Sequence, residues 1–183
     1  MNEYVAITGA SSGIGREAAK RFARRGKNLI LVARNAGRLE AVKKEIAAID
    51  GALKVVVKSA DLSKKGNAHA LYESLKNFAI ETWINNAGFG DYRAVHDQDL
   101  AKMERMLGLN VAAVAILSTL YARDYRETDN AQLINISSVG GYTIVPTAVT
   151  YCATKFFVGA FTEGLVKLSI HVSICISDCW KKK

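Results

Sequence analysis

A tyrosine and a lysine four residues apart form a candidate acid–base pair in the last third of the sequence. The stretch YCATK runs from Tyr151 to Lys155, and side chains four positions apart on a helix lie on one face. A tyrosine hydroxyl has an ordinary pKa of about 10, so it becomes a useful acid or base only where its anion is stabilised. A neighbouring ammonium supplies that stabilisation. The pair alone is weak evidence, because this spacing is common on ordinary helices.

A glycine-rich stretch near the N-terminus has the composition of a phosphate-binding loop. The segment TGASSGIG, from Thr8 to Gly15, follows an apolar run and opens a helical pattern. Glycines there let the backbone approach a pyrophosphate, whose charge is favourable at a helix N-terminus. The spacing is GxxxGxG rather than GxGxxG, and a simple turn is the alternative, but the position between strand and helix favours a nucleotide. The candidate contacts are Gly9, Ser11, Ser12, Gly13, Ile14 and Gly15.

The end of the second apolar run indicates which nucleotide is preferred. The stretch LILVARN offers Ala33 and Arg34 where an acidic residue would hold the 2′-hydroxyl of NAD. An arginine can instead pair with a 2′-phosphate through its forked donors, and Arg16 could assist from the adjacent predicted helix. The sequence therefore predicts NADP(H), with a solvated loop cation at Arg34 as the alternative.

Alternating strand and helix patterns would position these groups. Apolar runs at 3–8, 28–33, 54–58, 82–85, 131–136 and 170–176 alternate with helical patterns near 13–25, 36–49, 64–78, 98–126 and 148–168. Continuous apolar strands separated by helices are typical of a parallel sheet covered on both faces. With right-handed crossovers this gives an α/β, doubly wound, Rossmann-like sheet of order 3-2-1-4-5-6 in a single domain.

Composition excludes several other classes of protein. The formal net charge of +8 is spread over predicted helices without interleaved aromatic residues, which favours solvated helix faces over a nucleic-acid surface and leaves open a patch for a phosphorylated ligand. The most apolar stretch, 111–122, is too short to cross a bilayer, so no membrane span is predicted. Three cysteines without pair spacing or a secretory signal indicate a cytoplasmic protein. Three scattered histidines predict no metal site.

Further motifs occur in the order found in one family. Asp61 and Leu62, NNAG at 85–88, Asn110 and Ser138 accompany the glycine loop and the Tyr151–Lys155 pair. With these motifs the sequence resembles a short-chain dehydrogenase/reductase over essentially residues 2–176. The resemblance implies an NADP-dependent oxidoreductase that interconverts a ketone or aldehyde and an alcohol, as a homodimer or tetramer.

The resemblance also implies a role for each motif. Tyr151 would be the general acid or base and Ser138 would hydrogen-bond the substrate oxygen. Lys155 would lower the pKa of Tyr151 and hold the nicotinamide ribose, while Asn110 would anchor a proton-relaying water. The cofactor would further contact Asp61, at its adenine ring, with Leu62, Asn86, Ala87 and Gly88. Asn86 could equally be a hydrogen-bonding residue at a strand end.

The C-terminal end departs from the family pattern. In the family the sixth strand continues into a Pro-Gly turn, a substrate-covering segment and a seventh strand, whereas Ser177 and Asp178 stand at the turn here and three lysines follow. We therefore expect residues 1–176 to form the NADP-binding domain and 177–183 to be an aberrant basic tail of a truncated or frame-shifted chain. The alternative function is a catalytically impaired nucleotide-binding fragment.

Overall fold

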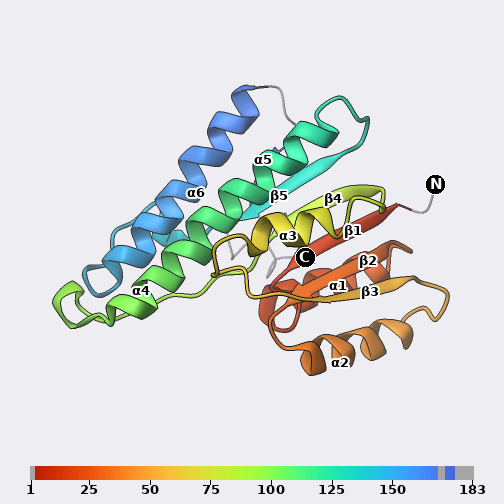
Figure 1. Ribbon diagram of the computed structural model, residues 1–183, viewed down its shortest axis with the longest axis horizontal. Coiled ribbons are helices and arrows are strands. Elements are labelled where there is room, and N and C mark those ends of the chain that lie inside the picture. Colours follow the sequence, from red (N-terminus) through yellow and green to blue (C-terminus); the bar gives the residue numbers. More distant parts are fainter. Residues whose placement is uncertain (1–2, 169–171, 176–183) are drawn as a thin grey trace.

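A six-stranded parallel sheet is the centre of the molecule (Figure 1). The computed structural model describes residues 3–168 and 172–175. The strands are β1 (Tyr4–Thr8), β2 (Asn28–Ala33), β3 (Val55–Ser59), β4 (Ile80–Asn85), β5 (Gln132–Ile136) and β6 (Val172–Cys175). They lie in the order β3-β2-β1-β4-β5-β6, and every neighbouring pair is parallel. The predicted fold class and strand order are confirmed.

Helices cover both faces of the sheet. They are α1 (Gly13–Ala23), α2 (Ala36–Ala47), α3 (Asn67–Glu73), α4 (Leu100–Leu107), α5 (Val114–Tyr125) and α6 (Val149–Lys167). Successive strand residues point to opposite faces, so Val5 and Ile7 of β1 pack with α1 and α2 in one core. Tyr4 and Ala6 belong to the other core, with residues of α3, α5 and α6. This two-sided burial explains why the strands read as continuous apolar runs.

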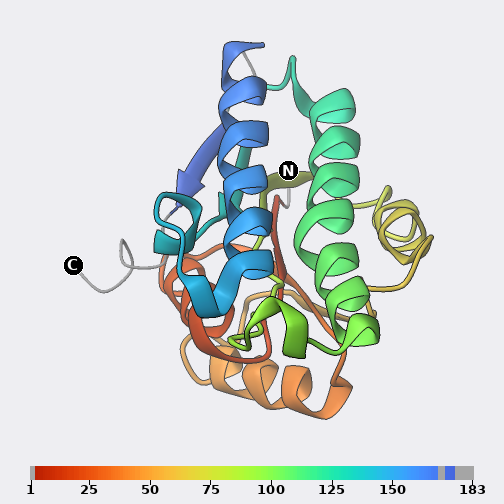
Figure 2. The same cartoon turned by 90° about the vertical axis from the view of Figure 1, so that its left-hand side faces the viewer.

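The predicted helix at 98–126 is a composite of three helical segments. A π-helical segment, Gly108–Ala113, joins α4 to α5. Figure 2 shows this long helix beside α6. By length and composition Leu100–Tyr125 is apolar enough to cross a membrane, but half of its most apolar window is buried inside the fold, as in a core helix of a soluble protein. The stretch 111–122 is too short to cross a membrane, but the whole helix that contains it is not. Length therefore does not argue against a span here, and the burial of the helix is the better argument for a core helix.

A buried polar network fixes the sheet to the helices that carry the site. Asn85 of β4 donates to Asn135 of β5 at 2.9 Å and to Ser118 of α5 at 3.0 Å. It accepts a hydrogen bond from the Trp83 indole, and Asn135 donates to Thr162 of α6 at 3.0 Å. Because unmade hydrogen bonds are costly in a buried place, this network specifies how α5 and α6 lie on the two strands.

Several boundaries differ from the sequence prediction. α3 covers only Asn67–Glu73, because Gly66 before it has φ +86° and the backbone leaves the helix after Ser74. Pro146 opens a short 3₁₀ turn, Pro146–Ala148, directly before α6. The predictions for His171 and for 176–183, including Ser177 and Asp178, lie outside the described residues.

Candidate active site

A cavity of about 430 Å³ opens where the strands end at the carboxyl edge of the sheet. Ligands of open α/β sheets bind at this edge, next to the point where the strand order reverses between β1 and β4. Segments from five of the six strand ends and from α2 and α6 meet here. The lining comprises Gly9, Ser11–Ile14, Val32–Asn35, Arg38, Ala60, Leu62, Asn86–Phe89, Leu109, Ile136, Ser137, Tyr151 and Lys155.

The glycine loop presents free backbone donors to this cavity. Ser12 is the N-cap of α1 in extended conformation, and its side chain makes no capping hydrogen bond, so the first amides of the helix stay available for an anion. Gly13 has φ +51°, and a Cβ there would meet nothing within 4 Å. Gly15 is not a lining residue: a Cβ there would collide with the carbonyl oxygen of Gly9, so this glycine permits close packing of the loop.

Asn86 holds the glycine loop against the end of β4. Its side-chain amide donates to the carbonyl oxygens of Thr8 (3.0 Å) and Gly9 (3.2 Å). The Thr8 hydroxyl accepts from the backbone N–H groups of Asn86 and Ala87, both at 3.0 Å. Asn86 is therefore a strand-end hydrogen-bonding residue that also lines the cavity, and its contact with the cofactor stays a prediction.

Two arginines lie at the α2 end of the cavity. Arg34 follows β2, and Asn35 caps α2 by accepting from the Arg38 N–H at 2.9 Å, so Arg38 belongs to the first helical turn. Both side chains line the cavity. The assistance expected from Arg16 is not found: its guanidinium donates to both carboxylate oxygens of Glu45, at 2.5 and 2.9 Å, and Arg16 is not a lining residue.

Asp61 and Leu62 differ in their relation to the cavity. Leu62 lines it, whereas Asp61 does not. One carboxylate oxygen of Asp61 accepts from the Ser63 hydroxyl (2.7 Å) and N–H (3.2 Å). Burial raises the pKa of Asp61, but the Ser63 hydrogen bonds, with the charges of Arg34 and Lys64, outweigh it and lower the pKa below its usual value. Asp61 is therefore the first residue of a turn, and its contact with the adenine ring stays a prediction.

Tyr151 lines the other end of the cavity and is hydrogen-bonded to Ser138, which is not itself a lining residue. Tyr151 lies in the first turn of α6, and Ser138 follows β5. Burial raises the pKa of the Tyr151 hydroxyl and outweighs its hydrogen bond with Ser138, which lowers it. This direction is opposite to the lowering by Lys155 that the resemblance implies, because burial is the largest influence on this hydroxyl. The phenol is therefore protonated at neutral pH, ready to donate a proton.

Lys155 is a buried ammonium. Only 8% of the residue is exposed, and Nζ donates to the Ile136 carbonyl oxygen at 2.9 Å. Burial lowers its pKa from 10.5 to about 8. A Cβ at Gly88 would lie 3.8 Å from this Nζ, so Gly88 keeps the space in front of the ammonium open.

Asn110 ties the helix of the site to the loop after β4. It lies in the π-helical segment, a feature frequent at functional sites. Its side-chain amide donates to the Phe89 carbonyl (2.9 Å) and to the Thr154 hydroxyl (3.1 Å), and its oxygen accepts from the Phe89 N–H (3.2 Å). Both side-chain N–H groups are thus committed to protein partners, and the water expected at Asn110 stays a prediction.

Sequence reasoning missed part of the lining. Arg38 and Asn35 were not singled out, although an Asn followed three positions later by Arg at a helix start signals a capped first turn. Ser137 was passed over in favour of Ser138. Its hydroxyl donates to the Lys155 carbonyl at 3.2 Å, which anchors α6 on β5. Phe89 and Leu109 carry no sequence signal beyond their hydrophobicity.

Comparison with known proteins shows the family. The sequence matches the family described as short chain dehydrogenase over residues 3–177, and the chain belongs to this family. An uncharacterized oxidoreductase of Staphylococcus saprophyticus is 32% identical over 90% of this chain and 66% of its own length. Against the first curated relatives that it matches, the chain spans 66%, 53% and 50% of their length.

Solved structures give the same family and fold. A short-chain dehydrogenase from Sphingobium yanoikuyae in complex with NADPH is similar at 34% identity and TM-score 0.87, over 95% of this chain and 70% of that one. A bulky-bulky ketone specific alcohol dehydrogenase from Comamonas testosteroni is similar at 31% identity and TM-score 0.87, over 96% and 74%. Other similar structures are complexes with NADP or with NAD.

Replacing Lys155 by Met should increase the stability of the ligand-free chain at pH 7. The folded state holds the protonated lysine at a cost, so Lys155→Met is expected to raise the free energy of unfolding by about 1–3 kcal/mol. Between pH 8 and 10.5 the unfolded wild-type chain binds a proton that the folded one has released, so wild-type stability should rise with pH there and the difference should shrink. Urea unfolding across this range measures both. A less stable variant at pH 7 together with a flat wild-type profile would contradict the buried charge.

Proposed function

We propose that this chain is an NADP(H)-dependent oxidoreductase that interconverts a carbonyl and an alcohol. The observation that carries this proposal is the layout of the cavity, with Arg34 and Arg38 at one end, free helix amides in the middle, and Tyr151 with Lys155 at the other end. Each part suits one portion of a dinucleotide, from the 2′-phosphate through the pyrophosphate to the nicotinamide ribose. The residues present therefore fit the cofactor.

The protein residues would bind, orient and move a proton. Tyr151 would donate its hydroxyl proton to the carbonyl oxygen during reduction, and accept it back during oxidation. Ser138 would hydrogen-bond the same oxygen and stabilise the negative charge that develops there. Lys155 would hold the ribose hydroxyls and favour the Tyr151 anion once the proton has left. The cofactor would supply the hydride.

The preference for NADP(H) rests on charge at the α2 end. No acidic side chain is among the described residues that line the cavity, whereas Arg34 and Arg38 are both there. A planar guanidinium suits a phosphate, and a carboxylate would suit a 2′-hydroxyl. The NADPH complex of the similar Sphingobium dehydrogenase supports the same choice.

A bulky apolar ketone or alcohol is the proposed substrate class. Large apolar side chains are exposed on the loops after β4 and β5: Tyr92, whose ring contacts Tyr151, and Val139, Tyr142, Ile144 and Val145. The similar Comamonas enzyme is described as specific for bulky-bulky ketones. Burying these side chains against a substrate would be favourable in proportion to the apolar area covered.

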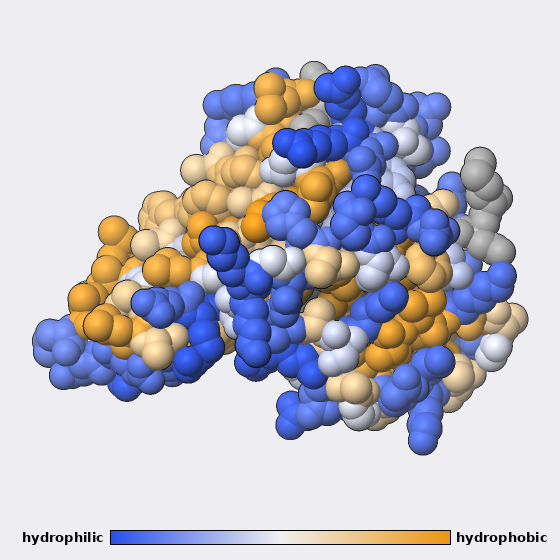
Figure 3. All heavy atoms as spheres, in the orientation of Figure 1, coloured by the Kyte–Doolittle hydropathy of each residue, from blue (hydrophilic) through white to orange (hydrophobic). Residues whose placement is uncertain are grey.

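Apolar exposure also supports a homo-oligomer. Leu100, Leu107, Val149 and Phe156 of the α4 and α6 region are exposed, and apolar side chains gather on the left of Figure 3, where these helices lie. A second copy of the chain would shelter such a patch.

A second candidate is a nucleotide-binding chain with impaired turnover. It is favoured by the exposure of the loop after β5, where Ile144 is 67% and Tyr142 58% exposed, because poor exclusion of water weakens electrostatic catalysis. NADPH binding without carbonyl reduction by the wild-type chain would select this candidate.

Tyr151→Phe should abolish carbonyl reduction while leaving cofactor binding intact. Losing the proton donor is expected to lower kcat by at least about 100-fold, with the Kd for NADPH changed by less than about twofold, since the ring remains. NADPH oxidation with a panel of ketones and fluorescence titration measure the two. Tyr4→Phe, at the opposite end of β1, is the control. A variant with near wild-type kcat would exclude Tyr151 as the acid.

Arg34→Ala should remove the preference for the phosphorylated cofactor. Loss of one charge-assisted pair is expected to raise the Kd for NADPH by about 10–100-fold while that for NADH stays nearly constant. Arg38→Ala should act in the same direction. Arg25→Ala, an exposed cation beyond the end of α1, is the matched control. If all three variants weaken NADPH binding equally, the effect is general charge and not a 2′-phosphate site.

A further inference from the structure

A buried carboxylate lies in the loop that follows β4. The Asp91 side chain is only 5% exposed and pairs with two cations. Arg93 binds it through two parallel contacts, Nε–Oδ1 at 3.1 Å and Nη2–Oδ2 at 2.6 Å, and the Lys102 Nζ lies 3.3 Å from Oδ2. Such a bidentate pair fixes orientation as well as distance. The Arg93 hydrogen bonds, with Lys102, outweigh burial and lower the pKa of Asp91 to about 2, so the pair is intact at neutral pH.

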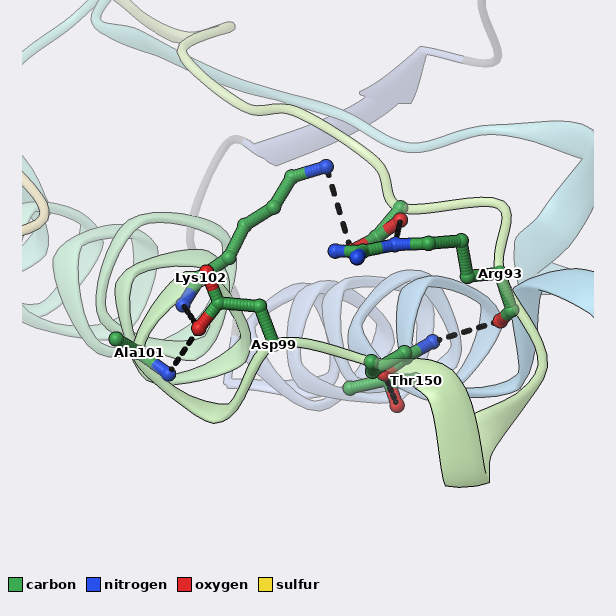
Figure 4. Close-up of polar contacts among 7 residues, drawn as sticks. Arg93, Asp99, Ala101, Lys102 and Thr150 are labelled. Atoms are coloured by element: carbon green, nitrogen blue, oxygen red, sulfur yellow. Dashed lines mark hydrogen bonds and ion pairs between the residues drawn. The ribbon is translucent and has the colours of Figure 1, made fainter.

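The same loop is tied to both helices of the site, as Figure 4 shows. Lys102 belongs to α4, whose N-terminus is capped by the Asp99 carboxylate through the Ala101 and Lys102 N–H groups at 2.9 and 3.3 Å. Gln98, nearly buried, donates to the Arg93 carbonyl oxygen at 3.1 Å and accepts from the Thr150 hydroxyl at 2.9 Å. Thr150 directly precedes Tyr151 on α6, so one chain of contacts runs from the Asp91 ion pairs to the start of that helix.

The residue held between the paired Asp91 and Arg93 touches the proton donor. The Tyr92 ring lies 5.9 Å from the Tyr151 ring, centroid to centroid, at 50°. A Cβ at Gly90 would lie 3.2 Å from Tyr151 and 3.3 Å from Tyr92, so the two rings and the loop backbone are in close contact. Tyr92 is 68% exposed. The residues on both sides of Tyr92 are paired with each other, which restricts the loop backbone that carries the ring.

We propose that Asp91 is a positioning residue, whose ion pairs with Arg93 and Lys102 hold the Tyr92 ring over Tyr151 and so cover the proton donor. This inference rests on the proposed role of Tyr151. The Tyr92 ring then serves as one wall of the reaction site, removing water from one side of the phenol. Without the ion pairs the loop loses its anchor on α4, and the ring leaves Tyr151 open to water.

A double-mutant cycle separates this role from a general effect on folding. The reference is Tyr92→Phe, which keeps the aromatic ring at position 92 but removes the Tyr92 hydroxyl group. Asp91→Asn in this background is expected to lower kcat about tenfold, the scale of a small misplacement at a reacting group, with the Kd for NADPH unchanged. In the Tyr92→Ala background Asp91→Asn should have no further effect, because its target is gone. Glu104→Gln, which removes an exposed carboxylate from α4, is the control.

Nitration of Tyr151 by tetranitromethane, located by mass spectrometry, compares the same variants in an experiment that does not require catalytic activity. Its rate should rise several-fold when Asp91→Asn is added to the Tyr92→Phe background. In the Tyr92→Ala background the rate should be equally high with and without Asp91→Asn. Equal effects of Asp91→Asn in both backgrounds, or none in either, would overturn the proposal. If no variant and no wild-type chain reduces ketones, the proposed function fails while the nitration cycle still decides the role of Asp91.

Discussion

The hydrogen bond from the buried Lys155 ammonium to a neutral backbone carbonyl is the interaction on which the arrangement at the carboxyl edge of the sheet depends. Lys155 donates to the Ile136 carbonyl at the end of β5, and its own carbonyl accepts from Ser137, the next residue along the chain. These two hydrogen bonds fix the first turns of α6 to β5, and with them Tyr151. Because a charge in a low-dielectric place is costly without a partner of opposite sign, the arrangement reduces stability at neutral pH. A structural role alone would be met as well by an apolar side chain, so the ammonium points to a ligand.

Other residues of the site keep the space in front of this ammonium open and its surroundings rigid. Gly88 has no side chain to fill it, and Asn110 binds the backbone of Phe89 just beyond. On the other side of the cavity, Asn86 holds the glycine loop to β4. Binding sites held by rigid strands and helix ends lose little entropy when a ligand arrives. The cavity is thus organised in advance, as the proposed binding of a dinucleotide requires.

Much of this could be predicted from the sequence because it depends on local patterns. Apolar runs predicted all six strands, and their alternation with helices favoured a doubly wound parallel sheet, for which 3-2-1-4-5-6 is a common strand order. The glycine loop, Arg34, Asn86 and Tyr151 were found because each directly follows a strand or opens a helix. Side-chain pairing across elements was not predictable: Arg16 of α1 pairs with Glu45 of α2, 29 positions away.

The direction of the Tyr151 pKa also required the structure. Spacing placed Lys155 on the same helix face, but the balance between burial and the ammonium depends on distances that sequence does not contain. The π-helical segment at Gly108–Ala113 likewise has no pattern of its own, since its residues suit an ordinary helix. These departures from regular rules fall at the site, where local preference gives way to function.

Direct hydride transfer is the central claim of this account, and isotope labelling tests it most directly. The wild-type chain would be incubated with acetophenone and NADPH that carries deuterium at both C4 positions of the nicotinamide. We predict that the product alcohol carries one deuterium at its carbinol carbon, as measured by mass spectrometry. No labelled alcohol above the level without protein, although NADPH binds, would contradict the account and leave a nucleotide-binding chain without this chemistry.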